Sequence, residues 1–121
     1  MATLSDAAKA VASQAIVDLI GAAGILEIGD SGFANTLSTV PLQNPAATVD
    51  GAGVITISVP DVDPNIAVTG TAAEARIRDG SSADIITGLT VGTGAEEIVV
   101  NDASFVNGQT FTLESGVLTP A

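Results

Sequence analysis

Side chains with catalytic or metal-binding chemistry are scarce in this sequence, and nearly all of them are carboxylates. The 121-residue chain holds 14 Asp and Glu against 3 Lys and Arg, a formal net charge of −11, and it has no His. It also has no Cys. Without these two residue types, thiol chemistry, disulfides, most metal-ligand sets and His-dependent catalysis are excluded. We therefore expect a protein that is not an enzyme, with no catalytic residues, no cofactor and no metal site.

One acidic segment has the spacing that opens a calcium loop. Asp61, Asp63 and Asn65 alternate with other residues, and oxygen ligands on alternate residues can converge on a hard cation. An EF-hand loop also needs Gly at its sixth position and an acid at its twelfth, where this chain has Ile66 and Ala72. The EF-hand interpretation fails. The segment is typical of a solvated acidic turn, and a looser calcium site is left open.

A second motif, Asp30-Ser31-Gly32, resembles the catalytic triplet of dimeric aspartic proteases. In those enzymes two carboxylates share one proton across a two-fold axis. No apolar-apolar-Gly-Arg segment follows late in the chain to support that chemistry. The triplet is therefore interpreted as a turn.

The remaining short motifs also indicate turns rather than sites. Asp79-Gly80 and Asn107-Gly108 are typical hairpin pairs. The glycines of Gly92-Thr93-Gly94 have no Lys nearby, so a phosphate-binding loop would lack its cation.

The three cations cannot form a nucleic-acid footprint, because phosphate binding needs clustered Lys and Arg. Arg76 and Arg78 share one face of an expected strand with Glu74. That alternation predicts charge pairing within the sheet or across a subunit contact. A Ser nucleophile would have no His base, and Lys9, the one Lys of the chain, falls in an expected helix.

The pattern of residues 5–22 predicts one amphipathic helix. Ser5 is a favourable N-cap, and Gly21 supplies a stop. Apolar residues at spacings of three and four form the stripe expected to dock on the chain's own sheet, namely Val11, Ala12, Ala15, Ile16, Leu19 and Ile20. Asp18 interrupts the apolar stretch, so no membrane span is expected.

From residue 25 onward the sequence alternates in the manner of short β-strands separated by turn residues. The expected strands are residues 25–28, 37–42, 54–59, 67–78, 85–91, 98–100, 109–114 and 117–118. Residues 67–78 and 85–91 are expected to form a long hairpin about Asp79-Gly80. The fold class is therefore predicted as mainly β, an antiparallel β-sandwich or jelly-roll-like domain over residues 25–119, with one N-terminal α-helix. Residues 1–121 are expected to form a single domain.

The order of these segments is similar to that of a known family. The chain has an Ala-rich helix over residues 7–20 and a Gly-Ala-Ala-Gly turn, then Asn44-Pro45-Ala46 and the strand at 54–59. Residues 75–80 (Ala-Arg-Ile-Arg-Asp-Gly), 107–113 (Asn-Gly-Gln-Thr-Phe-Thr-Leu) and 118–120 (Leu-Thr-Pro) complete the pattern. Taken together, these segments resemble small structural proteins of tailed bacteriophages, which are encoded among head and tail genes. Members of that family commonly have an aromatic residue in the strand before the Asp-Gly turn, where this chain has Arg76 and Ile77.

The resemblance implies an architectural role in the virion. We expect a decoration or cement protein on the capsid exterior, whose partners are the major capsid protein and, in a homotrimer, other copies of itself. The net charge of −11 disfavours an inward position beside packaged DNA. Two alternatives are left open: a neck or tail component, and a ligand- or carbohydrate-binding β-sandwich module.

Overall fold

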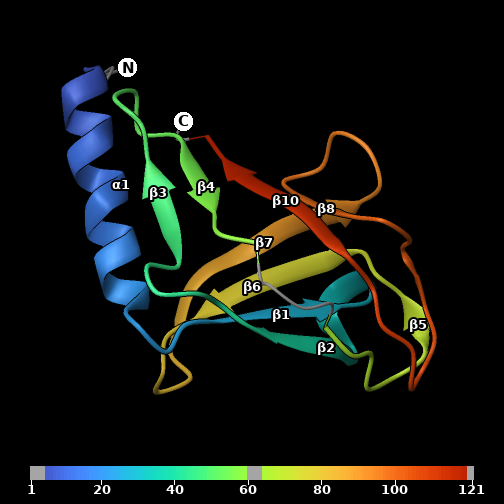
Figure 1. Cartoon of the computed structure of the whole chain (residues 1–121). Helices are drawn as coiled ribbons and strands as arrows, with labels where there is room; N and C mark the ends of the chain where they lie inside the picture. Colours follow the sequence, from blue (N-terminus) through green and yellow to red (C-terminus); the bar gives the residue numbers. More distant parts are fainter. Residues whose placement is uncertain (1–4, 60–63, 120–121) are drawn as a thin grey trace.

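The chain folds into a mainly β structure with one N-terminal helix, which confirms the expected fold class. A computed structural model describes residues 5–59 and 64–119 (Figure 1). Its helical elements are α1 (Asp6–Ile20) and the short 3-10 helix η1 (Ser31–Phe33). The strands of the described residues are β1 (Ile25–Gly29), β2 (Thr36–Pro41), β3 (Ala47–Val49), β4 (Ile55–Ile57), β5 (Gly70–Thr71), β6 (Glu74–Arg78), β7 (Asp84–Gly92), β8 (Ile98–Val100), β9 (Ser104–Phe105) and β10 (Leu113–Leu118).

Eight of these strands form one curled sheet with the order β2-β1-β6-β7-β8-β10-β4-β3. All neighbouring pairs are antiparallel except β7 and β8, which run parallel. Strands β5 and β9 form a separate two-stranded sheet at one end (Figure 1). Because β10 lies between β8 and β4, it joins the β3–β4 hairpin to the rest of the sheet. The curl gives a sandwich-like arrangement around one core.

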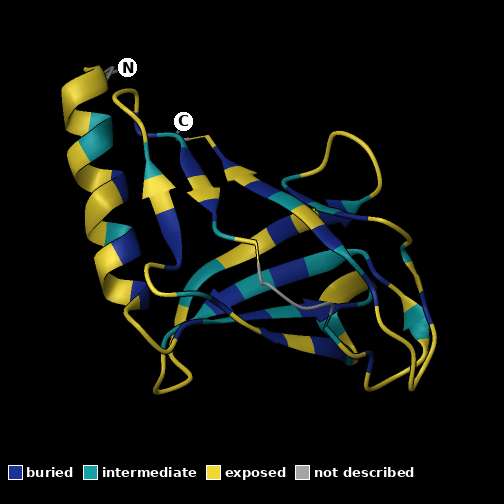
Figure 2. Cartoon of the chain, viewed as in Figure 1, coloured by how far each residue is buried: buried dark blue, intermediate teal, exposed yellow. Residues whose placement is uncertain are grey.

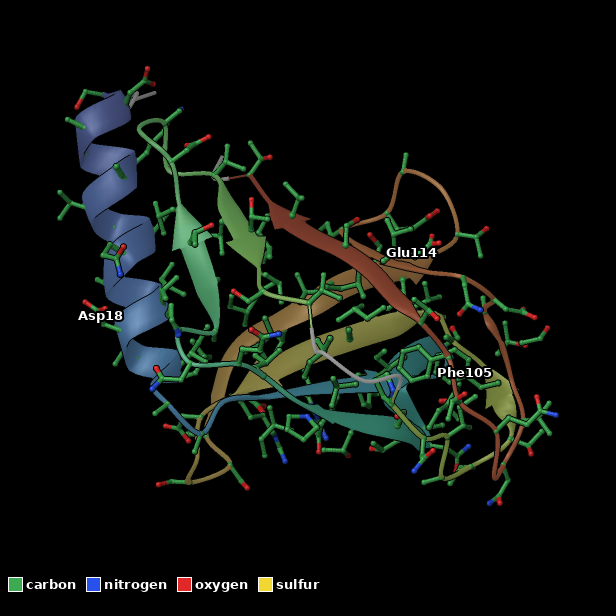
Figure 3. The ribbon with its side chains drawn as sticks, viewed as in Figure 1. Asp18, Phe105 and Glu114 are labelled. Carbon is green, nitrogen blue, oxygen red and sulfur yellow. The ribbon has the colours of Figure 1, made fainter. Side chains whose placement is uncertain are left out.

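The core is built from strand residues that alternate in and out. On β6, Ala75 and Ile77 are fully buried, while Glu74, Arg76 and Arg78 lie on the outer face. Figure 2 shows the same alternation along the sheet. Near the small sheet, the rings of Phe105 and Phe111 stack with centroids 4.5 Å apart, and Phe105 lies within the fold there (Figure 3).

Helix α1 begins at the expected N-cap, since the Ser5 hydroxyl accepts a hydrogen bond from the Ala8 backbone N–H at 3.2 Å. It ends at residue 20 rather than 22, because Gly21 adopts a positive φ of 72°. The helix packs beside β3 (Figure 1) and contacts β7.

The expected docking stripe of α1 is wrong in part. The residues that face the sheet are Ser13, Val17 and Ile20, with Ile16 half-buried, whereas Val11 is 72% exposed and Leu19 65% exposed. The buried Ser13 hydroxyl donates to the Gly53 carbonyl oxygen at 2.6 Å. This bond and the close approach of Gly53 to the Lys9 backbone fix the rotation of the helix. Neither contact can be read from the helical pattern.

Of the expected strands, 98–100 keeps its bounds, four others differ by one or two residues at an end, and three are rearranged. The single arm at 67–78 divides into β5 and β6, because Thr71 pairs with β9 whereas Glu74 pairs with β1 and β7. The strands expected at 109–114 and 117–118 merge into β10, while Thr110 forms an isolated bridge with Asn65. Residues 47–49 form β3, which the sequence pattern did not predict.

Candidate functional site

The two arginines form an ion-pair cluster on the outer face of the sheet. Arg76 Nε lies 2.6 Å from Glu27 Oε1, and Arg78 Nε lies 2.7 Å from Asp84 Oδ1 and 3.6 Å from Glu27 Oε1. The hydrogen bond from Arg78 lowers the pKa of the Asp84 carboxyl and raises the pKa of Arg78. The expected pairing within the sheet is thus present, with Glu27 and Asp84 as the acidic partners.

The aromatic residues leave little surface for stacking a sugar ring. The chain has three Phe, no Trp and no Tyr. Phe105 and Phe111 are buried, and the Arg76 guanidinium lies over the ring of Phe33, 4.4 Å from its centroid. Carbohydrate sites rely on aromatic platforms. This arrangement therefore gives no support to a carbohydrate-binding function.

The Asp30-Ser31-Gly32 motif lies in a tight turn before β2. Both carboxylate oxygens of Asp30 accept hydrogen bonds from Asn35, one from its backbone N–H and one from its side-chain amide, each at 2.9 Å. These bonds lower the pKa of Asp30. The carboxylate therefore holds the η1 turn together, as the turn interpretation requires.

The Gly92-Thr93-Gly94 segment folds around an acidic side chain. The Gly94 N–H donates to Glu96 Oε1 at 2.9 Å, and a Cβ on Gly92 would lie 2.4 Å from the same carboxylate. A negative group thus already occupies the place that a phosphate would need. Asp79-Gly80 and Asn107-Gly108 both lie in turns, as expected.

The calcium hypothesis falls largely outside the described residues, because Asp61 and Asp63 belong to 60–63. Asn65 is described, and its backbone carbonyl accepts a hydrogen bond from the Ser38 hydroxyl at 2.6 Å. Within 5–59 and 64–119, no group of three or more acidic residues is placed to hold a metal ion.

The outward side of α1 is an exposed apolar surface, although the sequence pattern places most of its residues in the stripe expected to dock on the sheet. We call it the outer stripe, and its members are the exposed residues Ala8, Val11, Ala12, Ala15 and Leu19. Figure 2 shows this side of the helix exposed along its length, and Asp18 lies on its border, pointing away from the sheet (Figure 3). In the described part of the chain, no helix has the length and apolar character required to cross a membrane.

A groove of about 240 Å³ opens between β7 and the end of β10, with α1 at its base. Its walls include residues 86–89 of β7, Ile55 of β4 and residues 118–119, while Ser13 and Ile16 of α1 and the side chain of Glu97 complete it. No sequence signal predicts this groove, since it depends on where β7 gains its pairing with β8.

No protein-family model, curated protein or solved structure matches this chain.

Proposed function

We propose that this chain is a non-enzymatic structural protein of a tailed bacteriophage particle, and that it decorates the outside of the head. The proposal starts from the order of segments in the sequence, which is similar to small head and tail proteins. It draws further support from composition, because a chain without His and Cys lacks the usual groups for catalysis.

The observation that carries the proposal is the outer stripe. Val11 and Leu19 are 72% and 65% exposed although α1 is already packed against the sheet through its opposite side. Exposed apolar surface of this kind is typical of protein contact sites. A decoration protein must bury such surface against neighbouring subunits, since many weak contacts together hold it on the shell.

The charge of the molecule suggests how copies would meet. Each copy carries a net charge of −11, so approach through most faces is repulsive. The five residues of the outer stripe are uncharged, and copies that meet there bury apolar area with the least repulsion. We therefore place the self-contact of a homotrimer at the outer stripe, with the major capsid protein as the second partner. The same charge favours the capsid exterior over contact with packaged DNA.

The deciding experiment is the copy number and position of the chain in native particles. Quantitative mass spectrometry gives the number, and cryo-electron microscopy gives the symmetry. We expect hundreds of copies on the outer shell. A handful of copies in a ring would move the protein to the neck or tail, and complete absence from particles would overturn the virion role.

A further inference from the structure

Strand β7 lies in the interior of the sheet order, yet half of it has an open edge. Its pairing with β6 extends from Asp84 to Thr90, with register shifts that leave Thr87 and Gly88 unpaired, whereas its pairing with β8 involves only Val91 and Gly92. Among the described residues, positions 84–90 therefore have a neighbouring strand on one side only. An open edge presents backbone N–H and C=O groups that can pair with another chain.

This open edge borders the groove. Four consecutive residues of β7, 86–89, line it. The pairing of β7 with β6 has a bulge at Thr87 and Gly88, where Gly88 adopts a φ of 74°. Residues 86–89 therefore follow the wall of the groove without regular alternation. Thr87 and Gly88 are exposed, and a Cβ built on Gly88 would meet no atom within 4 Å. The edge is thus accessible to an incoming chain.

The groove is apolar inside and small. Ile16, Ile55 and Ile86 supply side chains from three different elements, and Ile16 and Ile86 are half-buried, so they remain reachable. A volume of about 240 Å³ lies below the roughly 300–1,000 Å³ of typical small-molecule sites. The space suits a few side chains of an extended segment better than a whole ligand.

Glu97 sets the charge of the groove and marks the end of the open edge. Its Oε1 accepts a hydrogen bond from the Thr90 backbone N–H at 3.2 Å. A side-chain carboxylate therefore takes the donor that a neighbouring strand would otherwise use. The two arginines of the chain are paired with Glu27 and Asp84 on the outer face of the sheet. The groove and the net charge of −11 together favour a basic occupant.

We propose that the groove binds an extended, basic segment of a partner protein, which adds a strand along residues 84–90 of β7. Alternate apolar side chains of that segment fill the space among Ile16, Ile55 and Ile86, and a Lys or Arg approaches Glu97. Main-chain hydrogen bonds supply affinity in this mode, and the side-chain pockets supply selectivity. A second copy of this chain is a poor occupant, because it carries only 3 Lys and Arg against 14 Asp and Glu. This inference does not depend on the virion role.

The test uses the full chain and a synthetic hexapeptide that alternates lysine or arginine with valine. A second peptide replaces each cation by glutamate. Backbone amide exchange is measured by NMR with and without each peptide. With the basic peptide at about ten times its Kd, we expect exchange within residues 84–90 to slow by about tenfold, and the glutamate peptide to have no effect. This measurement needs no variant.

Two variants with matched controls locate the site. Thr87→Trp fills the groove, and Thr39→Trp places the same side chain on an exposed position of β2. Glu97→Gln removes a charge in the groove while keeping an acceptor for Thr90. Glu114→Gln removes one outside the groove, from an exposed residue on the outer side of β10 (Figure 3). We expect weaker binding of the basic peptide by Thr87→Trp and Glu97→Gln, and unchanged binding by both controls.

Four results would each overturn the proposal: no binding of the basic peptide, equal binding of the glutamate peptide, protection that lies outside residues 84–90, or unchanged binding by a folded Thr87→Trp variant. Protection of 84–90 that rises with protein concentration in the absence of peptide would assign the groove to a second copy instead. Particle copy number is independent of all these outcomes, so the two proposals can fail separately.

Discussion

At the scale of single residues, several carboxylates of this protein have local partners that explain their positions. Asp30 holds the η1 turn through Asn35, Glu96 fills the loop around Gly92, and Asp79 accepts hydrogen bonds from Ser81 and Ala83 in the hairpin turn. Each carboxylate lies in or directly beside a Gly-containing turn motif that is visible in the sequence. The conclusion that these motifs form turns therefore needed only local information.

The Arg78–Asp84 pair predicts a pH dependence. Its hydrogen bond lowers the pKa of Asp84 in the folded chain below the ordinary value of 3.8. The stabilisation is therefore present in full above pH 3.8 and is lost as the pH falls through the folded-state pKa. We expect Asp84→Asn to lower the Tm at pH 7 by no more than a few degrees, since the pair is exposed.

The difference in Tm between Asp84→Asn and the natural chain should narrow as the pH falls below 3.8. Circular dichroism melts from pH 7 to pH 2.5 measure it, with Glu114→Gln as a control for the general change in net charge. A difference that stays constant down to pH 2.5 would show that the pair does not act through ionisation.

Gly53 carries a second prediction at this scale. Its φ is +85°, and an added Cβ would lie 2.7 Å from the backbone carbonyl of Lys9 on α1. Gly53→Ala should therefore cost at least about 1–2 kcal/mol of unfolding free energy, from the left-handed backbone alone. Gly51→Ala in the same turn meets no atom within 4 Å and should change stability by less than about 0.5 kcal/mol. Urea unfolding of the two variants measures both changes in unfolding free energy. Equal changes would show that the close approach of Gly53 to α1 is not required for stability.

At the scale of elements, the periodicity of the sequence predicted which helices and strands form better than it predicted which of their faces are buried. The strand at 98–100 has the expected bounds, and Ala75 and Ile77 face the core as the alternation requires. The buried side of the helix was harder to predict, because apolar residues lie on both sides of α1. When two apolar stripes compete, the contact at Gly53 decides which is buried, and that contact spans 40 residues of sequence.

The outer stripe and the groove differ in how far the sequence could indicate them. The outer stripe could have been found by noting that Val11 and Val17 cannot share one side of a helix. The groove could not be found in this way, because it forms beside the part of β7 that has β6 as its single neighbouring strand among the described residues. Strand β3 was missed because only three residues pair there, between the turn residues Pro45 and Gly51.

A pair of valines tests the orientation of α1. Val17 is 5% exposed and Val11 is 72% exposed. Val17→Ala should lower the unfolding free energy by about 1–3 kcal/mol through lost apolar burial and an unfilled space. Val11→Ala should change it by less than about 0.5 kcal/mol. Equal effects of the two substitutions, measured by urea unfolding, would contradict the observed rotation of the helix.

At the scale of the whole molecule, the proposed self-association should depend on net charge. Copies of net charge −11 repel one another, and salt screens that repulsion, with a Debye length of about 10 Å at 0.1 M. If copies meet through the uncharged outer stripe, self-association should strengthen as NaCl rises from about 0.02 to 0.3 M. Sedimentation equilibrium measures the trend. Weakening with added salt would point instead to ion pairs between copies.

A charge placed on the outer stripe should disrupt the same contact. Leu19→Asp puts a carboxylate among the apolar residues of α1, and the oligomer should dissociate to monomers. Val106→Asp adds the same charge outside the outer stripe, at a valine that is 43% exposed and follows β9. That control should leave the oligomer intact. If both variants dissociate alike, the effect is one of net charge rather than of the stripe.

The position of β10 between β8 and β4 has a consequence for synthesis of the chain. A ribosome releases the β3–β4 hairpin early, but the strand that ties this hairpin to β8 is residues 113–118. Helix α1, which packs beside β3, shares that delay. The β3–β4 hairpin, with α1 beside it, therefore has no link to β8 until almost all of the described chain has emerged. The apolar surfaces of the nascent hairpin would therefore remain accessible to a chaperone for nearly the whole of translation.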